Sequence, residues 1–65
     1  MDEFSLAKAS DLLGTQDIPG SESELKMLCV RIRELVEING EDWVRQHSQK
    51  LLDEWEYIVR QGIIS

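Results

Sequence analysis

Residues 21–62 decide the fold of this chain and read SESELKMLCVRIRELVEINGEDWVRQHSQKLLDEWEYIVRQG. The pattern predicts two amphipathic helices that fold back on each other at Asn39-Gly40. Ser21 is followed three residues later by Glu24, which is the spacing of a capping box that satisfies two backbone N–H groups at a helix start. We therefore expect the first helix to begin near Glu22.

The first of these helices carries a core face. At about 100° per residue, six apolar side chains fall within a stripe about 120° wide, as in a helix with one buried side. They are Leu25, Leu28, Cys29, Ile32, Leu35 and Val36. Three further apolar residues, Met27, Val30 and Ile38, lie outside that stripe. A solvated helix surface does not need them, so we expect another surface to cover them.

The dipeptide Asn39-Gly40 predicts a break, because glycine adopts the left-handed conformation that ends a helix without strain. One continuous helix is the competing interpretation, since a single internal glycine costs only about 1 kcal/mol. The second apolar stripe argues against it, because in a straight rod its centre would lie about 130° from the first. This stripe consists of Val44, Leu51, Leu52, Trp55, Ile58 and Val59. We therefore predict an antiparallel hairpin with helices over residues 22–39 and 41–61.

The ends and outer sides of these helices follow ordinary helix chemistry. Gly62 is the predicted stop of the second helix, with Ile63 placed for the apolar contact that often accompanies such an end. Three glutamate-first pairs, four residues apart, each contribute about 0.2–0.5 kcal/mol to helix stability. They are Glu22–Lys26, Glu41–Arg45 and Glu56–Arg60. These charges need no functional explanation.

Residues 1–20 form an N-terminal arm ahead of the hairpin of residues 21–65. The segment 5–14 predicts a short helix with Leu6, Ala9 and Leu13 on one side and Gly14 as its stop. The segment 15–20 is a predicted loop, because its Pro-Gly pair suits a turn. We expect the arm to dock on the hairpin; the alternative is an arm that orders only with a partner. The residues expected to make the contact are Phe4, Leu6, Leu13 and Ile18.

With 65 residues the chain makes one small domain, whose core alone is only marginally stabilising. The predicted class is all-α, and we expect two hairpins to pair into a dimeric four-helix bundle. Cys29 is the single cysteine, so we expect a buried thiol in a reducing compartment, the cytoplasm. The sequence has no apolar run long enough for a membrane span and no secretory leader pattern, so we expect no membrane partner.

No catalytic, cofactor or metal motif emerges from the sequence. His47 is the single histidine and is predicted to lie at the edge of the second stripe, without a carboxylate placed to orient it. Cys29 and His47 lack the further ligands at close spacing that a metal site needs. We therefore expect a protein that is not an enzyme and that holds no cofactor.

Charge favours a protein partner over a nucleic acid. Thirteen acidic and seven basic residues give a net charge of −6, which repels DNA and RNA. We predict a homodimer that serves as a protein interaction or regulatory module. The residues expected to bind partners are Met27, Val30, Ile38, Trp43 and Tyr57. Trp43 has a second interpretation, as a cap over Val36 and Ile38 at the end of the bundle.

The alternative function is a small helix-turn-helix-like regulator that binds nucleic acid. The segment 6–14 would then be the first helix, and Lys26, Arg31 and Arg33 would belong to the reading helix. The Pro19-Gly20 pair in an overlong turn and the net negative charge argue against this alternative.

Overall fold

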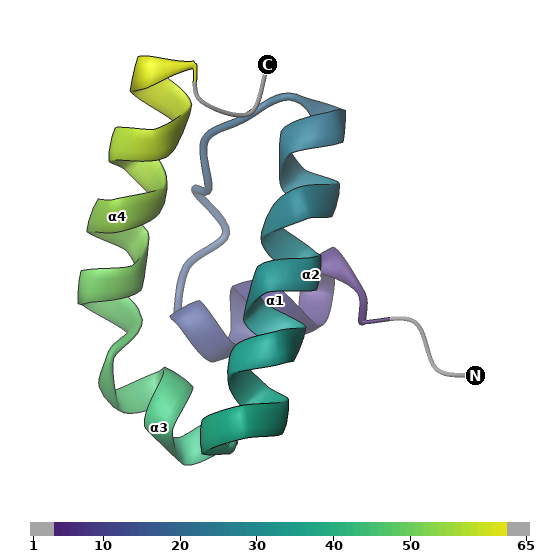
Figure 1. The fold of residues 1–65 in the computed structure, drawn as a ribbon, viewed down its shortest axis with the longest axis vertical. Helices are drawn as coiled ribbons and strands as arrows, with labels where there is room; N and C mark the ends of the chain where they lie inside the picture. The colour runs from purple at the N-terminus through teal and green to yellow at the C-terminus, as the bar shows by residue number, and fades with distance from the viewer. Residues whose placement is uncertain (1–3, 63–65) are drawn as a thin grey trace.

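Four helices make up the part of the chain that the structure, a computed structural model, describes: residues 4–62 (Figure 1). They are α1 (Leu6–Leu13), α2 (Glu22–Asn39), α3 (Glu41–Gln46) and α4 (Ser48–Gln61). No strand occurs within these residues. The predicted all-α class is confirmed, whereas the pairing of two chains into a four-helix bundle stays a prediction.

The capping box at the start of α2 is present as predicted. The Glu24 N–H donates to Ser21 Oγ at 3.3 Å, and the Ser21 N–H donates to Glu24 Oε1 at 2.8 Å. These two bonds satisfy N–H groups that have no partner inside the helix. The start of α2 is therefore fixed by residues that are adjacent in the sequence.

Gly40 alone connects α2 to α3. Its backbone has φ 93° and ψ 161°, so the break occurs where it was predicted but without the left-handed helical geometry expected there. The Gly40 N–H donates to the Val36 carbonyl at 2.8 Å, and the Gly40 carbonyl accepts from the Val44 N–H at 3.4 Å. One residue thus ends one helix and begins the next, in a backbone region that is almost exclusive to glycine.

The single helix predicted over residues 41–61 is wrong, because the chain breaks at His47, where φ is −105° and ψ is 15°. The His47 N–H is shared between the carbonyls of Trp43 and Val44, at 3.1 and 3.2 Å. His47 Nδ1 also lies 2.8 Å from the Trp43 carbonyl oxygen. These bonds satisfy the end of α3, and the change in ψ redirects the chain into α4.

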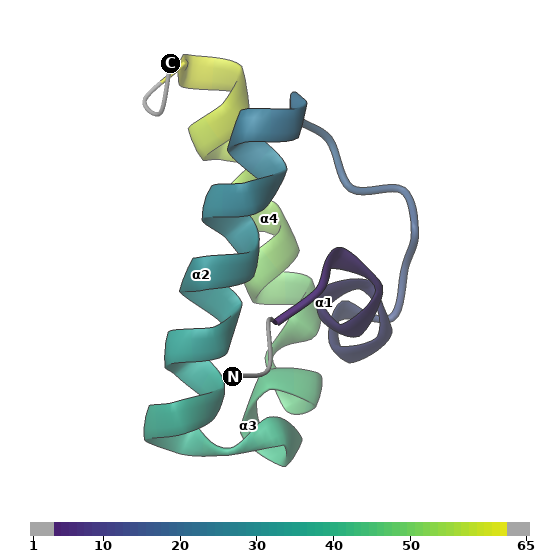
Figure 2. The same ribbon diagram turned by 90° about the vertical axis from the view of Figure 1, so that its right-hand side faces the viewer.

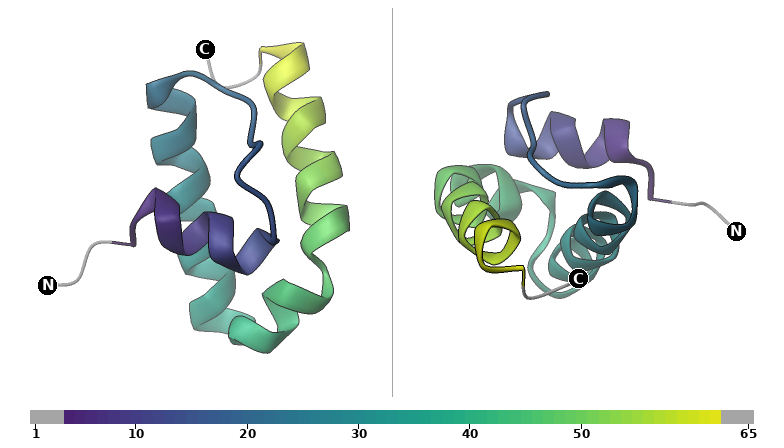
Figure 3. Two further views of the ribbon diagram at one scale, coloured as in Figure 1. Left: turned by 180° about the vertical axis from the view of Figure 1, so that it is seen from behind. Right: turned by 90° about the horizontal axis from the view of Figure 1, so that it is seen from above.

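The two long helices α2 and α4 run antiparallel, with α3 closing one end between them (Figure 1). The N-terminal arm lies across one side of this pair (Figure 2; Figure 3). α1 packs against each of the other three helices, whereas α2 and α4 approach each other at few points. Much of the predicted hairpin core is therefore formed through α1.

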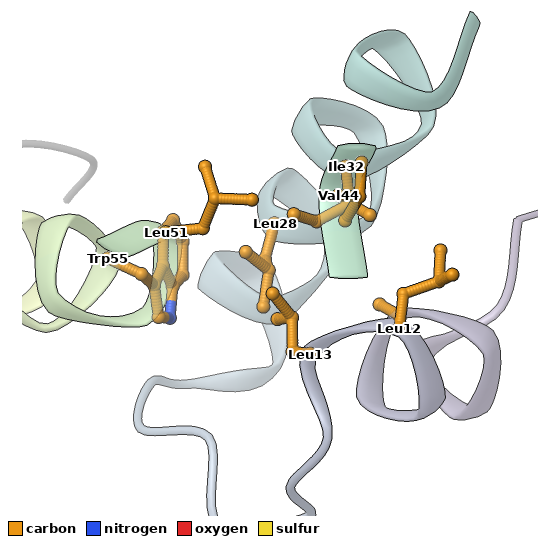
Figure 4. Close-up of a cluster of buried hydrophobic side chains, with 8 residues drawn as sticks. Leu12, Leu13, Leu28, Ile32, Val44, Leu51 and Trp55 are labelled. Atoms are coloured by element: carbon orange, nitrogen blue, oxygen red, sulfur yellow. The ribbon is translucent and has the colours of Figure 1, made fainter. Parts of the chain in front are cut away.

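The core contains eight buried apolar residues contributed by all four helices (Figure 4). They are Ala9, Leu12, Leu13, Leu28, Ile32, Val44, Leu51 and Trp55. Phe4 and Ile18 pack against this cluster, so the arm docks as we expected. Leu6 is not part of this buried cluster: it is 40% exposed, whereas Leu12 is 1% exposed. The buried face of α1 is rotated by about 40° from the predicted one.

Ion pairs tie α1 to α3. Lys8 Nζ lies 3.3 Å from Glu41 Oε1, and Arg45 lies 2.9 Å from Asp11 Oδ2. Arg45 also donates to the Asp11 carbonyl at 3.4 Å. The predicted Glu41–Arg45 pair is therefore wrong, because each of the two side chains reaches across to α1. Glu41 and Arg45, which we expected to stabilise one helix, therefore join α3 to α1.

Helix α1 is capped at both of its ends, and α4 is capped at its C-terminus. Ser5 Oγ accepts from the Lys8 N–H at 3.2 Å, and Gly14 and Gly62 end α1 and α4 as predicted. The apolar contact predicted for Ile63 falls outside the described residues. Over residues 4–62, none of the helices combines the length and the apolar character that crossing a bilayer requires.

Candidate functional site

The residues predicted to bind partners occupy three separate places. Val30 lines a groove between α1 and α2. Met27, Ile38 and Tyr57 lie on the outer sides of α2 and α4, at 51%, 77% and 60% exposure. Trp43 lies in α3 and is half-buried against the core. The structure therefore does not gather the five residues into one site.

The groove lies where the start of α1 meets the first half of α2. Its apolar lining consists of Phe4, Leu6, Leu25, Cys29 and Val30, and its volume is about 520 Å³. Glu22, Lys26 and Arg33 add three charged groups to the lining. An open apolar groove with a charged edge has the character of a surface that receives a side chain or a helix.

A second feature is the outer stripe of α2, which we define as Met27, Arg31, Glu34 and Ile38. At about 100° per residue, these four positions fall within about 60° of one another around the helix. All four are exposed. α1 packs against the other, core side of α2, which carries the buried Leu28 and Ile32.

The outer stripe continues toward α4. Arg31 lies 3.5 Å from Glu54 Oε1, and about half of the Arg31 side chain stays exposed. Because α2 and α4 run antiparallel, Tyr57, one turn after Glu54, lies near the level of Met27, one turn before Arg31. Met27 and Tyr57, both exposed, therefore lie at a similar level of the two helices.

Trp43 stacks on His47. The ring centroids are 4.2 Å apart and the planes differ by 23°. A carbonyl oxygen only accepts, so His47 Nδ1 carries the proton in its contact with the Trp43 carbonyl. Of the two residues in the cap interpretation, Ile38 is 77% exposed and so is not buried by Trp43, whereas Val36 packs against the core. Both rings lie at the break between α3 and α4, and their stacking packs the end of α3.

Cys29 is half-buried in the groove lining, less buried than we predicted. Burial raises the pKa of the Cys29 thiol above its ordinary value. The thiol is therefore protonated at neutral pH and is a weak nucleophile. Among residues 4–62, no group of three or more His, Cys, Asp or Glu side chains could hold a metal ion.

Two of the three basic side chains of the alternative, DNA-reading interpretation pair with carboxylates. Arg31 pairs with Glu54, and Arg33 lies 3.7 Å from Glu37 Oε1. Lys26 stands at the edge of the groove. The face expected to read bases therefore has no cluster of unpaired cations to neutralise a phosphate backbone.

The groove was missed from the sequence because two helices form it. Leu25 and Cys29 were assigned to the core stripe of α2 and Leu6 to the docked face of α1. In the structure, Leu6 of α1 and Val30 of α2 both line the groove, at 40% and 47% exposure.

Comparison of the chain with protein-family models, with curated proteins and with solved structures found no match.

Proposed function

We propose that this chain is a non-catalytic protein-interaction module that acts as a helical homo-oligomer and binds or regulates a protein partner. One observation carries the proposal: large apolar side chains of α2 stay exposed after α1 has docked. Met27, Val30 and Ile38 are 51%, 47% and 77% exposed. Large apolar side chains that stay exposed on a small domain are typical of surfaces that bind other proteins.

The described part of the N-terminal arm, residues 4–20, does not cover Met27 and Ile38. In a monomer, residues 1–20 would have to shield these side chains. The described part of the arm instead packs on the core side of α2, where it buries Ala9, Leu12 and Leu13. Met27 and Ile38 are left for a companion chain, and Val30 for whatever occupies the groove.

The chemistry of the groove supports binding over catalysis. Cys29 is the one thiol in its lining, and its raised pKa keeps it protonated. The lining holds no histidine that could act as a base toward it. What the groove offers is apolar area next to charged groups, which suits recognition of a peptide or a helix.

We propose a cytoplasmic location on the basis of the cysteine usage. The chain has one cysteine, which cannot form an intramolecular disulfide. A small domain without disulfides, whose one thiol is half-buried, suits a reducing compartment.

The nucleic-acid alternative is less well supported. The net charge of −6 repels a phosphate backbone at long range, and Arg31 and Arg33 already pair with Glu54 and Glu37. Binding to generic duplex DNA that weakens steeply with salt would favour this alternative.

Affinity capture with the full chain tests the proposed function. We expect the wild-type chain to retain a stoichiometric protein, and Val30→Glu to lose it if the groove holds that partner. Ala7→Glu is the matched control, because it adds the same charge at an exposed position of α1 outside the groove. A chain that neither self-associates nor retains any protein would contradict the proposal.

A further inference from the structure

The outer stripe of α2 has the same spacing in both directions. Met27 and Arg31 are four residues apart, Arg31 and Glu34 three, and Glu34 and Ile38 four. The order is apolar, basic, acidic, apolar. A second copy turned by a two-fold rotation therefore meets this stripe with an apolar residue opposite an apolar residue and a cation opposite an anion.

The direction of pairing follows from the charges. In a parallel pair, Arg31 would face Arg31 of the second copy and Glu34 would face Glu34, which places like charges together. In an antiparallel pair, Arg31 faces Glu34 and Met27 faces Ile38 of the second copy. Antiparallel pairing therefore removes the repulsion and covers both apolar ends.

We propose that two copies of this chain pair through the outer stripes of their α2 helices, antiparallel about a two-fold axis. This inference rests on the proposed function, whose homo-oligomer it specifies. Met27 and Ile38 supply the apolar contacts, at 51% and 77% exposure in the single chain. Arg31 and Glu34 fix the register and the direction.

Arg31 can serve both chains. It pairs with Glu54 of its own chain at 3.5 Å while about half of its side chain stays exposed. A guanidinium has five N–H donors in a planar fork, so it can bind two carboxylates at once. Tyr57, 60% exposed and at the level of Met27, would add contact area near that end.

The expected affinity of the dimer follows from the length of the outer stripe. At about 1.5 Å rise per residue, Met27 and Ile38 are about 17 Å apart along α2. One helix contact of this length lies at the small end of specific interfaces, below about 1,200 Å². We therefore expect reversible association with a micromolar or weaker Kd, visible in a concentration series up to about 0.5 mM.

Two charge reversals test the pairing by sedimentation equilibrium. In R31E alone, an acidic group at position 31 faces Glu34 of the second copy; in E34R alone, a basic group faces Arg31. Each variant alone should self-associate at least about tenfold more weakly than the wild type, because two symmetry-related pairs become repulsive. An equimolar mixture of R31E and E34R should recover a heterodimer, since both facing pairs are then complementary.

The controls separate folding from pairing. Glu56→Arg makes the same charge change as E34R at an exposed position of α4 outside the stripe, and should leave self-association unchanged. The Arg31–Glu54 pair is exposed, so R31E should retain its helicity by circular dichroism. Ile38→Ser, at a residue that is 77% exposed, should weaken the dimer without loss of fold.

Three results distinguish pairing through the outer stripe from pairing elsewhere and from no pairing. Monomeric single variants with a heterodimer on mixing would support the inference. A wild-type dimer that E34R and Ile38→Ser leave intact would overturn the inference and leave the proposed homo-oligomer standing on another surface. A wild-type chain that stays monomeric up to about 0.5 mM would overturn both.

Discussion

The indole N–H of Trp55, in α4, donates a hydrogen bond to the carbonyl of Pro19 at 2.8 Å. Trp55 is 2% exposed, so the indole N–H has no access to water as a substitute partner. The two residues are 36 positions apart and join α4 to the linker that leads from α1 into α2. This bond therefore holds the linker of the N-terminal arm against α4.

Trp55→Phe should destabilise the protein by about 1–3 kcal/mol. The variant keeps an aromatic ring in the core but leaves the Pro19 carbonyl without its donor and opens space beside it. A lower urea midpoint with an unchanged slope would show the loss. Trp43→Phe is the control, since Trp43 is only half-buried and its stacking on His47 can be kept. Equal losses in the two variants would contradict the account.

Gly40→Ala should destabilise the protein by about 1–3 kcal/mol through the backbone alone. Gly40 has φ 93°, and a Cβ built there meets no atom within 4 Å. The cost therefore comes from a conformation that alanine rarely adopts and not from a clash. Asn39→Ala, at the exposed last residue of α2, should change the free energy of unfolding by less than about 0.5 kcal/mol. Equal stability of Gly40→Ala and wild type in thermal melts would contradict this geometry.

Leu12→Ala and Leu6→Ala are matched truncations in the same helix. Leu12 is 1% exposed and Leu6 40% exposed. We expect Leu12→Ala to cost about 2–5 kcal/mol, which is comparable to the whole stability of a domain of this size. Leu6→Ala should cost less than about 1 kcal/mol. The helical signal at 222 nm, followed with temperature, checks both, and the reverse order would mean that α1 docks through its predicted face.

Cys29 should react slowly with a thiol-directed alkylating reagent at neutral pH in the folded protein, and faster as pH rises. Burial raises the pKa of this thiol, so thiolate is scarcer than in the unfolded chain. The stabilisation linked to the protonated thiol is complete below the thiol's ordinary pKa and is lost as pH rises through the folded pKa. Alkylation rates with and without denaturant check the shift, and faster reaction in the folded state at neutral pH would contradict it.

Local signals in the sequence were enough to predict much of the fold. The capping box at Ser21, the break at Gly40 and the stop at Gly62 depend on neighbouring residues, and the structure has all three. The break at His47 was not predictable in this way, because the spacing of Val44, Leu51 and Trp55 also fits a continuous helix. The break appears only in the structure, where His47 bonds back to the carbonyls of Trp43 and Val44.

The orientation of α1 and the candidate surfaces were harder to predict. Leu6 and Leu12 lie on either side of the apolar face of a short helix. Which of the two is buried depends on the helices that pack against α1, whose residues are distant in sequence. The exposed residues of α2 were found because they lie off its core stripe. The groove depends on how two helices meet, which periodicity within either helix does not encode.

Sedimentation of the wild-type chain beside a Met27→Ser/Ile38→Ser variant, over one concentration series, shows whether the outer stripes of α2 hold two copies together. We expect the wild-type mass to rise with concentration toward twice the monomer mass. The variant should stay monomeric with the same helical content, because both residues are exposed in the single chain. A wild-type mass that stays at the monomer value, or a variant that associates as strongly as wild type, would contradict this pairing.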